Sequence, residues 1–273
     1  MTKPKQITKT RLAIKLGVSR SSLYYKPKLP DRDEEMKHQI EAVLTENPEY
    51  GHKRIALELK LNKKRILRVM KKFEIRPRRR KVKKPKKLGD IGNEPSSFPN
   101  VSLLWCPVKE GVLWASDFTY LYFQGRFFYL ATIIDVYTRE IVGYHLSRHH
   151  QSSLVLSALE DALGRHSPPL WIHSDQGSEY NSKIYISRCH RAGIQISMSA
   201  KASPWHNPFQ ESFYDKFKVT LGFLDRFENL GELIAAIHEA VYYYNHKRIH
   251  SALKMSPVAY KQRLTTNNDR LIV

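Results

Sequence analysis

Residues 112–147 read VLWASDFTYLYFQGRFFYLATIIDVYTREIVGYHLS, and this stretch decides the fold class. It contains three runs rich in β-branched and aromatic residues, at 112–123, 126–137 and 140–147. Two short polar turns, Gln124-Gly125 and Thr138-Arg139, separate these runs. Runs of this composition joined by short turns are typical of antiparallel strands. We therefore predict a three-stranded antiparallel meander.

The residues that follow alternate between helical and strand patterns. The segment SSLVLSALEDALGRH, residues 152–166, has apolar residues at helical spacing. After it we expect a strand at 169–175, a helix that begins near Gln176 to Ser178 with Ser178 as its cap, a strand at 193–199, and a long helix after Asn207. Three antiparallel strands, a helix, and parallel strands alternating with helices form the ribonuclease-H-like order. The predicted fold class is α/β, with a mixed five-stranded sheet and flanking helices.

The charge of the chain is unevenly distributed. The 273 residues contain 46 Lys and Arg against 26 Asp and Glu, a formal net charge of +20. Residues 1–90 hold 28 basic and 10 acidic side chains, whereas residues 91–273 hold 18 and 16. The chain therefore consists of a cationic arm and a nearly neutral body. Clustered cations of this kind indicate a nucleic-acid partner.

Composition excludes several classes of protein. With 41% apolar residues the body can bury a full core, which excludes wholesale disorder. Only two cysteines occur, Cys106 and Cys189, too few for a disulfide framework or a cysteine-rich zinc site. The longest apolar stretch, residues 127–134, is far shorter than the roughly 20 residues that a bilayer requires. The opening MTKPKQITKTR also lacks the apolar segment of a signal peptide. We expect a soluble, cytoplasmic protein with no membrane partner.

Two helix-turn-helix patterns precede the body. In residues 11–25, Leu12, Ala13 and Leu16 share one predicted helical face, Gly17 interrupts it, and Ser19 is placed to cap a second short helix. Residues 31–73 predict one long helix followed by two shorter ones. We expect this second unit to be an all-α helix-turn-helix domain that binds DNA.

The last helix of that unit carries the cations expected to contact DNA. They surround its apolar stripe and are Lys63, Lys64, Arg65, Arg68, Lys71 and Lys72. The segment RPRRRKVKKPKKLG at 76–89, which includes Arg78, Arg79 and Arg80, reads as an extended linker that can lie along phosphates. The alternatives are that these cations merely solvate helix surfaces, or that they bind another polyanion. The adjacent helix-turn-helix patterns favour DNA.

Three acidic residues fall at corresponding places in the predicted body. Asp117 lies within the first strand, Asp175 just after the fourth, and Glu211 in the first turns of the helix after the fifth. This order brings all three to one end of the sheet. Gathered carboxylates repel one another unless a cation lies among them, and Mg²⁺ prefers a few carboxylate oxygens. Each acid alone is weak evidence, since an Asp at a strand end is often a turn or cap residue.

The residues around these acids resemble a known catalytic domain. The segments WASDFTYL, IHSDQGSEY and NPFQESFYDKFK, with 35 residues between the last two acids, are similar to the DDE domain of retroviral integrases and bacterial transposases. The chain resembles the product of the second reading frame of the IS-three family of insertion-sequence transposases. The segments PEYGHKRIALEL, GVSRSSLYY and YYNHKRIHSALKMSPVAY carry the likeness along nearly the whole chain. The family's usual Gly and Asp-Asn before the last acid are replaced by Ala202 and His206-Asn207, which leaves the role of His206 open.

The resemblance implies specific roles for the site residues. Asp117 would bridge two Mg²⁺ or Mn²⁺ ions, Asp175 would hold one and Glu211 the other. Lys218, two turns after Glu211 on the same helical face, would reach a phosphate near the cut, although it also reads as an ordinary surface lysine. His173 is expected either to touch substrate or to be a satisfied histidine of the strand. In the tail, Arg248 and Lys254 would contact DNA.

The implied activity is DNA transposition. The arm would recognise the terminal inverted repeats of a bacterial insertion sequence, and the metal site would cleave one strand and join its 3′ hydroxyl to another phosphodiester. Two alternatives remain open: a DNA-binding regulator on an inactive integrase-like fold, and a ribonuclease-H-type nuclease. Joining two ends implies a homo-oligomeric synaptic complex, with a first-frame protein or its frameshift fusion as a further partner and a nucleoid-associated location. The end sequence, target preference and subunit number are not specified by the sequence.

The expected domain organisation follows from these patterns. We predict a short helix-turn-helix segment at 1–30, a helix-turn-helix domain at 31–75, a basic linker at 76–108, a catalytic core at 109–225, and a C-terminal helix with a basic tail at 226–273.

Overall fold

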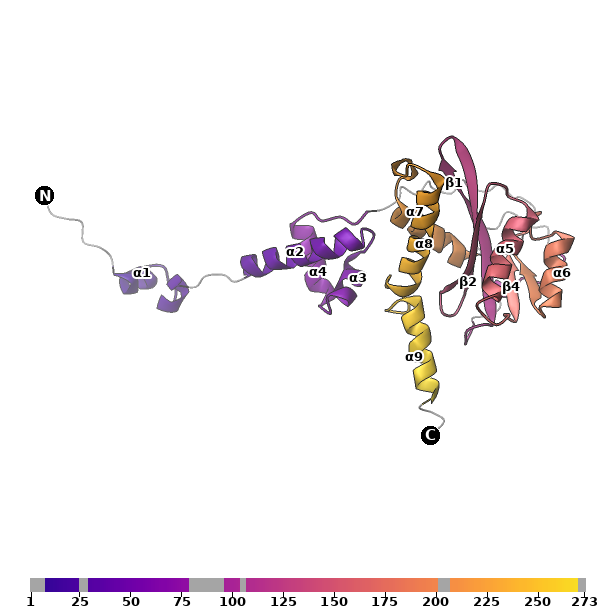
Figure 1. Ribbon diagram of the computed structural model, residues 1–273. Helices are drawn as coiled ribbons and strands as arrows, with labels where there is room; N and C mark the ends of the chain where they lie inside the picture. The colour runs from indigo at the N-terminus through magenta and orange to yellow at the C-terminus, as the bar shows by residue number, and fades with distance from the viewer. Residues whose placement is uncertain (1–7, 25–28, 79–95, 104–106, 201–206, 270–273) are drawn as a thin grey trace.

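The computed structural model describes residues 8–24, 29–78, 96–103, 107–200 and 207–269 (Figure 1). Several residues singled out by the sequence lie outside these ranges, namely Cys106, Arg79, Arg80, Ala202 and His206.

The body is built on a five-stranded mixed sheet. Its strands are β1 (Leu113–Phe123), β2 (Arg126–Asp135), β3 (Ile141–Ser147), β4 (Trp171–Ser174) and β5 (Gln195–Met198), in the spatial order β3–β2–β1–β4–β5. The first three strands are antiparallel neighbours, and β4 and β5 run parallel to β1 on its other side. The predicted meander and the ribonuclease-H-like order are confirmed.

The turn between β1 and β2 lies where the sequence predicted it. Gln124 and Gly125 both have left-handed backbones, with φ of 46° and 75°. Two consecutive left-handed residues form the kind of tight turn whose twist matches that of the flanking strands. This turn sets the register in which Asp117 lies opposite Thr132.

Helices cover both faces of the sheet (Figure 1). One face packs against α5 (Ser152–Leu163) and α6 (Lys183–Arg191), and the other against α7 (Pro208–Leu221) and α8 (Leu230–His246). Short 3₁₀ turns occur at η2 (Val101–Leu103) and η4 (Leu224–Arg226). The chain continues past α8 into α9 (Pro257–Asp269), where the sequence predicted only a basic tail.

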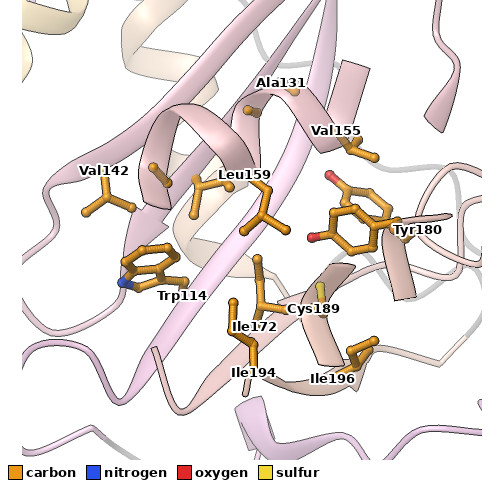
Figure 2. Close-up of a cluster of buried hydrophobic side chains, with 14 of the residues drawn as sticks. Trp114, Ala131, Val142, Val155, Leu159, Ile172, Tyr180, Cys189, Ile194 and Ile196 are labelled. Atoms are coloured by element: carbon orange, nitrogen blue, oxygen red, sulfur yellow. The ribbon is translucent and has the colours of Figure 1, made fainter. Parts of the chain in front are cut away.

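The core between the sheet and α5 and α6 fixes the strands that carry the acids (Figure 2). Trp114 of β1, Leu159 of α5, Ile172 of β4 and Cys189 of α6 all lie in this cluster and are at most 2% exposed. The Cys189 thiol is thus a small apolar core group, and burial raises its pKa to about 12. A metal-binding role for this cysteine is not supported.

Gly143 lets β3 approach α5 more closely than any other residue would. A Cβ at this position would lie 2.4 Å from the Ala158 carbonyl oxygen and 2.6 Å from the Ala162 Cβ. These contacts involve backbone and a short side chain, so relief requires the strand and helix to separate. We expect Gly143→Ala to destabilise the fold by about 3 kcal/mol and to lower the melting temperature by roughly 6–12 °C, measured by circular dichroism.

Gly51 provides the matched control for this substitution. It has an ordinary φ of −81°, and a Cβ there would meet nothing within 4 Å. Gly51→Ala should therefore shift the melting temperature by no more than roughly 2 °C. Equal shifts in the two variants would show that the contact of β3 with α5 is not tight.

The helix after β4 begins later than the sequence predicted. Residues near Gly177 form a turn in which the N–H groups of Tyr180 and Asn181 both donate to the Gly177 carbonyl. Helix α6 starts only at Lys183, and Ser182, rather than Ser178, caps it by accepting from the Tyr185 N–H. The expected start near Gln176 to Ser178 was wrong because these residues make the turn beside Asp175.

The arm contains the predicted three-helix unit. It comprises α2 (Leu29–Glu46), α3 (His52–Glu58) and α4 (Lys63–Lys72) around a small core that includes Ile40, Ile55, Ile66 and Val69, each fully buried. Asn62 caps α4 by accepting a hydrogen bond from the Lys64 N–H at 2.8 Å.

The first helical segment has the two predicted short helical stretches, and Ser19 caps the second by accepting a hydrogen bond from the Ser22 N–H at 3.2 Å, but the burial of its apolar face differs from the prediction. It consists of α1 (Lys9–Lys15) and the 3₁₀ turn η1 (Arg20–Tyr24). Ala13 is buried, but Leu12 and Leu16 are 37% and 58% exposed. The predicted apolar face is therefore only partly covered within the described residues.

An ion cluster, here called the Glu49 joint, connects the arm to the C-terminal segment. Glu49, which lies between α2 and α3, accepts hydrogen bonds at Oε1 from Arg248 Nε at 2.6 Å and from Arg54 Nη1 at 2.9 Å. Beside it, the Ile249 N–H donates to the Tyr50 hydroxyl at 2.6 Å, and Tyr243 donates to Asn47. The side chains of Glu49 and Arg248 are only 4% and 5% exposed.

The Glu49 joint changes the role expected for Arg248. The sequence predicted this arginine as a DNA contact. Its side chain is instead buried in an ion pair that holds the end of α8 against the arm. A carboxylate 199 positions away in the chain supplies the partner, which no local pattern indicated.

Candidate active site

The three acids predicted from the sequence come from three elements at one end of the sheet. Asp117 is a half-buried residue in the middle of β1, Asp175 directly follows β4, and Glu211 lies in the first turn of α7. Because β1 and β4 are parallel neighbours, their carboxyl ends point the same way. The structure therefore brings the three carboxylates into electrostatic contact.

The pKa of Asp117 reflects both its burial and the neighbouring charges. Burial, the charge of Asp175 and, less strongly, the charge of Glu211 raise this pKa to about 7. The Phe118 N–H, which donates to Asp117 Oδ1 at 2.8 Å, and the ammonium of Lys218 act in the opposite direction. At neutral pH the group therefore titrates between its neutral and charged forms.

Helix α7 is fixed to β1 by three polar side chains. Asn207 donates to the Ser116 carbonyl at 3.1 Å, Gln210 to the Ala115 carbonyl at 2.6 Å, and the Tyr214 hydroxyl to the Asp117 carbonyl at 2.7 Å. Gln210 is fully buried. These contacts determine where Glu211 stands relative to Asp117, and reasoning from the sequence did not identify Gln210 or Tyr214 as positioning residues.

The turn after β4 positions Asp175. The Gly177 N–H donates to Asp175 Oδ1 at 2.9 Å, and a Cβ on Gly177 would lie 3.0 Å from the same oxygen. Desolvation by surrounding protein atoms raises the pKa of Asp175, the Gly177 hydrogen bond lowers it, and the charge of Glu179 raises it further. Glycine at this position leaves room for the carboxylate.

Glu179 and His150 form a pair beside this turn that the sequence analysis missed. Glu179 is 7% exposed and accepts from His150 Nδ1 at 2.9 Å and from the Ser178 hydroxyl at 3.2 Å. Burial alone would raise the pKa of Glu179, but the hydrogen bonds from His150 and Ser178 outweigh it and lower the pKa. The His150 ring stacks on Phe118, the residue next to Asp117. The sequence could have indicated Glu179, because it lies only four residues after Asp175.

His173 has a structural role. Its side chain is 1% exposed, and its Nδ1 lies 2.8 Å from the Ser197 hydroxyl on the neighbouring strand. Of the two expectations stated for this residue, the satisfied strand histidine is the one that the structure supports.

Lys218 lies beside the acids. It is two turns after Glu211 on α7, its ammonium lies 5.1 Å from the centre of the Tyr120 ring, and its charge lowers the pKa of Asp117.

A groove beside Lys218 is lined by aromatic and cationic side chains, namely Arg78, Tyr120, Lys218 and Phe223. Arg78 lies over the ring of Phe223. Exposed aromatic rings interleaved with cations are found where proteins contact nucleic-acid bases and phosphates.

The donor chemistry of the site suits a hard divalent cation. The charges of Asp175 and Glu211 raise the pKa of Asp117, and a cation among the three carboxylates would relieve that repulsion. Within the residues that the structure describes, no three His, Cys, Asp or Glu side chains converge tightly enough to form a ready-made ligand cluster. Carboxylate oxygens are donors of the kind that Mg²⁺ or Mn²⁺ prefers.

A stability measurement can detect the raised pKa of Asp117. Because its pKa is about 7 in the folded chain against 3.8 normally, the metal-free protein should lose stability as the pH rises from about 4 to about 7. Asp117→Asn removes this loss. At pH 8 without metal we expect Asp117→Asn to be more stable than the wild type by about 2 kcal/mol. This is less than the free energy equivalent to the whole pKa shift, because structural relaxation in the wild type reduces it. Unfolding in urea at pH 4 and pH 8 measures the difference, and equal stability of the two proteins at pH 8 would contradict it.

Comparisons with known proteins agree with this architecture. Residues 107–204 match a family described as an integrase core domain, and residues 192–257 match a second family of the same description. The chain is 30% identical over 260 residues to InsK of Escherichia coli K12, named as a transposase for insertion sequence element IS150, with 90% of each chain covered. The chain belongs to the IS-three type of insertion-sequence transposases.

Two further matches extend these comparisons. A 31 kDa protein of insertion element IS600 from Shigella sonnei is 33% identical over 268 residues, which cover 90% of this transposase and 96% of that protein. A solved HTLV-2 integrase catalytic core in complex with magnesium is 18% identical, with a TM-score of 0.47, over 61% of this transposase and 99% of that chain.

The cations of α4 divide into two groups in this transposase. Arg68 and Lys72 bind the buried carboxylate of Asp33 at 2.5 and 3.0 Å, and the Arg68 hydrogen bond does most to lower the pKa of Asp33 to about 2. These two cations tie α4 to α2. The remaining cations, Lys63, Lys64, Arg65 and Lys71, are exposed.

The exposed cations at the start of α4 are unfavourable for the helix itself. Lys63, Lys64 and Arg65 occupy its first turn, where the helix dipole disfavours positive charge. Their position suits an external anion instead. Lys254, on the loop after α8, is also exposed. Across the described residues, no helix has both the length and the apolar character to span a membrane.

Proposed function

We propose that this transposase cleaves the ends of its insertion sequence and joins them to target DNA at a site formed by Asp117, Asp175 and Glu211. The observation that supports the proposal is the convergence of these three acids. Burial and the charges of Asp175 and, less strongly, Glu211 raise the pKa of Asp117 to about 7, and Lys218 lies beside them. The chain belongs to the insertion-sequence transposases, and its core matches an integrase core domain. This membership indicates the reaction class, which is transfer of a polynucleotide strand.

Each residue of the site has a role in this reaction. Asp117, Asp175 and Glu211 would hold two Mg²⁺ or Mn²⁺ ions, which when bound activate an attacking hydroxyl and stabilise the leaving oxygen of a phosphodiester. Gln210 and Tyr214 keep Glu211 in place, and Gly177 orients Asp175. Lys218 binds a phosphate next to the scissile bond. Water supplies the hydroxyl for cleavage, and the freed 3′ hydroxyl of the DNA attacks in the joining step.

The three-helix unit of the arm would hold the element ends. In helix-turn-helix domains the first residues of the last helix contact base edges, and in α4 these are Lys63, Lys64 and Arg65. Lys71, Arg78, Lys254 and the linker cations Arg79 and Arg80 would bind phosphates. Affinity should consequently fall steeply with salt concentration.

Joining two ends requires more than one catalytic core. We propose a homo-oligomeric synaptic complex on double-stranded DNA. A first-frame protein, or its fusion to this chain, is the further partner to include in any reconstitution. The partly exposed apolar face of α1 is a candidate contact for it.

Incubation with two labelled substrates tests the proposal. In Mg²⁺, with and without the first-frame protein, we expect nicking of duplex DNA that carries the element ends, no cleavage of an RNA–DNA hybrid, and loss of activity in EDTA. Cleavage of the hybrid alone would favour a ribonuclease-H-type nuclease. Binding of the end duplex without cleavage under any of these conditions would favour a regulator on an inactive fold.

A further inference from the structure

The far half of the β1–β2 hairpin carries three exposed aromatic rings that contact one another, here called the hairpin aromatic cluster. Tyr120 and Tyr122 are two residues apart in β1 and so point to the same face, and Phe127 of β2 lies opposite Tyr122. The Phe127 ring centre is 5.0 Å from that of Tyr122 and 5.8 Å from that of Tyr120. Each of the three side chains is at least 50% exposed. Single exposed rings are ordinary, whereas a contiguous group of them marks a binding surface.

The hairpin aromatic cluster lies on the strand that carries Asp117. At about 3.3 Å per residue, Tyr120 is about 10 Å and Tyr122 about 17 Å further along β1 than Asp117. Strand β4 pairs only with Leu113–Ala115 of β1, so within the described residues no strand covers that edge of β1 beyond these positions. The hairpin therefore extends past the end of β4, next to the acids.

A groove of about 570 Å³ lies between the cluster and the end of α7. Tyr120 and Tyr122 line it from β1, and the exposed Phe223 lines it just after α7. A cation accompanies the rings from each side. The Lys218 ammonium lies 5.1 Å from the centre of the Tyr120 ring, and the Arg78 guanidinium lies 5.3 Å from the centre of the Phe223 ring.

The exposed rings, rather than net charge, distinguish this groove. No acidic side chain is among the described residues that line it. However, Asp215 lies one turn before Lys218 on α7, and Asp225 directly follows Leu224, which lines the groove. The groove therefore has no simple excess of positive charge. Apolar ring faces with cations beside them match a nucleotide, because its base is flat and its phosphate is anionic.

Only unpaired nucleotides can stack on rings of this kind. In a duplex the neighbouring base pairs cover both faces of each base, so a base has to leave the stack before a protein ring can cover it. Stacking on an aromatic side chain changes affinity by roughly 5-fold to 150-fold per base. A contribution of this size can offset the cost of opening a few base pairs.

We propose that the hairpin aromatic cluster and its groove bind unpaired nucleotides of the DNA next to the scissile bond, with bases stacked on Tyr120 and Tyr122 and phosphates beside Lys218 and Arg78. That the nucleotides belong to DNA at the cut rests on the proposed function. The position of the groove next to the acids, and the cations over its rings, favour nucleotides over a second copy of this chain. Binding of this kind would hold the end of the element open at the acids.

The first experiment compares two DNAs by fluorescence anisotropy, with the full chain in EDTA. One is a fully paired duplex that carries the element end, and the other has a few mismatched nucleotides at that end. The wild type should bind the mismatched DNA about tenfold more tightly, and contacts of the arm with the duplex cancel in this ratio. Tyr122→Ala should remove most of the preference, and Tyr122→Phe, which keeps the ring, should retain it. Equal affinity of the wild type for the two DNAs would contradict the proposal.

Tyr242→Ala is the matched control for Tyr122→Ala. The two tyrosines are both 57% exposed, but Tyr242 lies on α8, where its ring stacks on His246. Tyr242→Ala should keep the preference of the wild type for mismatched DNA. An equal loss of preference in both alanine variants would show that the hairpin aromatic cluster is not its source.

The second experiment places 2-aminopurine at the mismatched positions, because its fluorescence falls when a ring stacks on it. At saturating protein the wild type should quench the probe, and Tyr122→Ala should leave it brighter. Equal fluorescence with the two proteins would overturn the proposal. A change in the solution mass of the DNA-free protein in Tyr122→Ala, measured by sedimentation, would then identify a second copy of the chain as the occupant.

Neither experiment requires catalysis. A chain that prefers mismatched DNA through Tyr122 but never cuts DNA would refute the proposed function and leave the nucleotide site intact. A chain that cuts DNA, with Tyr122→Ala behaving as the wild type in both binding assays, would refute the nucleotide site alone.

Discussion

Asp117→Asn and Glu211→Gln are each expected to lower the rate of end cleavage by about 10³-fold or more, equivalent to about 4 kcal/mol of transition-state stabilisation. Each change removes a negative charge from a cluster in which Asp175 and Glu211 already raise the pKa of Asp117. Side-chain shape is preserved in both variants, so DNA binding should stay within about twofold of the wild type. Gel assays of cleavage at saturating Mg²⁺, with anisotropy for binding, measure the two effects separately.

Glu239→Gln is the matched control for Glu211→Gln. Glu239 is an exposed carboxylate on α8, and no hydrogen bond links it to α7 or β1 among the described residues. Its loss should leave the cleavage rate within about twofold. A comparable loss of rate in the control and in Glu211→Gln would mean that α7 carries no specific catalytic carboxylate.

Glu49→Gln should destabilise the chain by about 3–5 kcal/mol, because it leaves two buried guanidinium groups without a countercharge. Arg248 and Arg54 both donate to one oxygen of this carboxylate, and their side chains are 5% and 14% exposed. The contact between the arm and the end of α8 depends on the same cluster. Limited proteolysis should therefore release the arm faster from the variant than from the wild type.

Glu58→Gln offers a control on the same domain. Glu58 is exposed at the end of α3, so its neutralisation should change stability by no more than about 0.5 kcal/mol. Urea unfolding of the three proteins gives the comparison. If Glu49→Gln unfolds at the same urea concentration as Glu58→Gln, the Glu49 joint contributes nothing to stability.

The sheet could be predicted from the sequence because its signals are local. Strands β1 to β3 are runs of β-branched and aromatic residues, and Gln124-Gly125 marks a tight turn with two left-handed residues. The positions of the three acids in the fold could be predicted from the order of the elements, whereas their roles came from the resemblance to DDE domains. The parallel strand order brings the end of β4, and with it Asp175, next to β1. The helix after β5 then carries Glu211.

The features that escaped prediction depend on contacts distant in sequence. The burial of Arg248 requires Glu49, and the anchoring of Glu211 requires Gln210 to reach the carbonyls of Ala115 and Thr132. The pairing of Glu179 with His150 spans 29 positions. The late start of α6 has a local cause, since Ser182 caps the helix, but Ser178 offered an equally good cap in the sequence.

The α4 cations show how the structure refines a charge pattern. All six looked equivalent in the sequence, yet Arg68 and Lys72 neutralise the buried Asp33. The sequence contains Asp33 in an acidic run, where nothing distinguishes a buried partner from a solvated one. Only the folded arrangement of α2 against α4 separates the cations that pair with Asp33 from the other four.

Strand transfer from a modified end tests the central claim most directly. Pre-cleaved element-end duplexes, with either a 3′ hydroxyl or a 3′ dideoxy terminus, are incubated with target DNA, Mg²⁺ and the wild-type or Glu211→Gln protein. If the three acids direct attack by the DNA hydroxyl itself, joined product should form only from the wild type and only with the 3′ hydroxyl end. Joined product from the dideoxy end, or equal product from Glu211→Gln, would contradict this assignment.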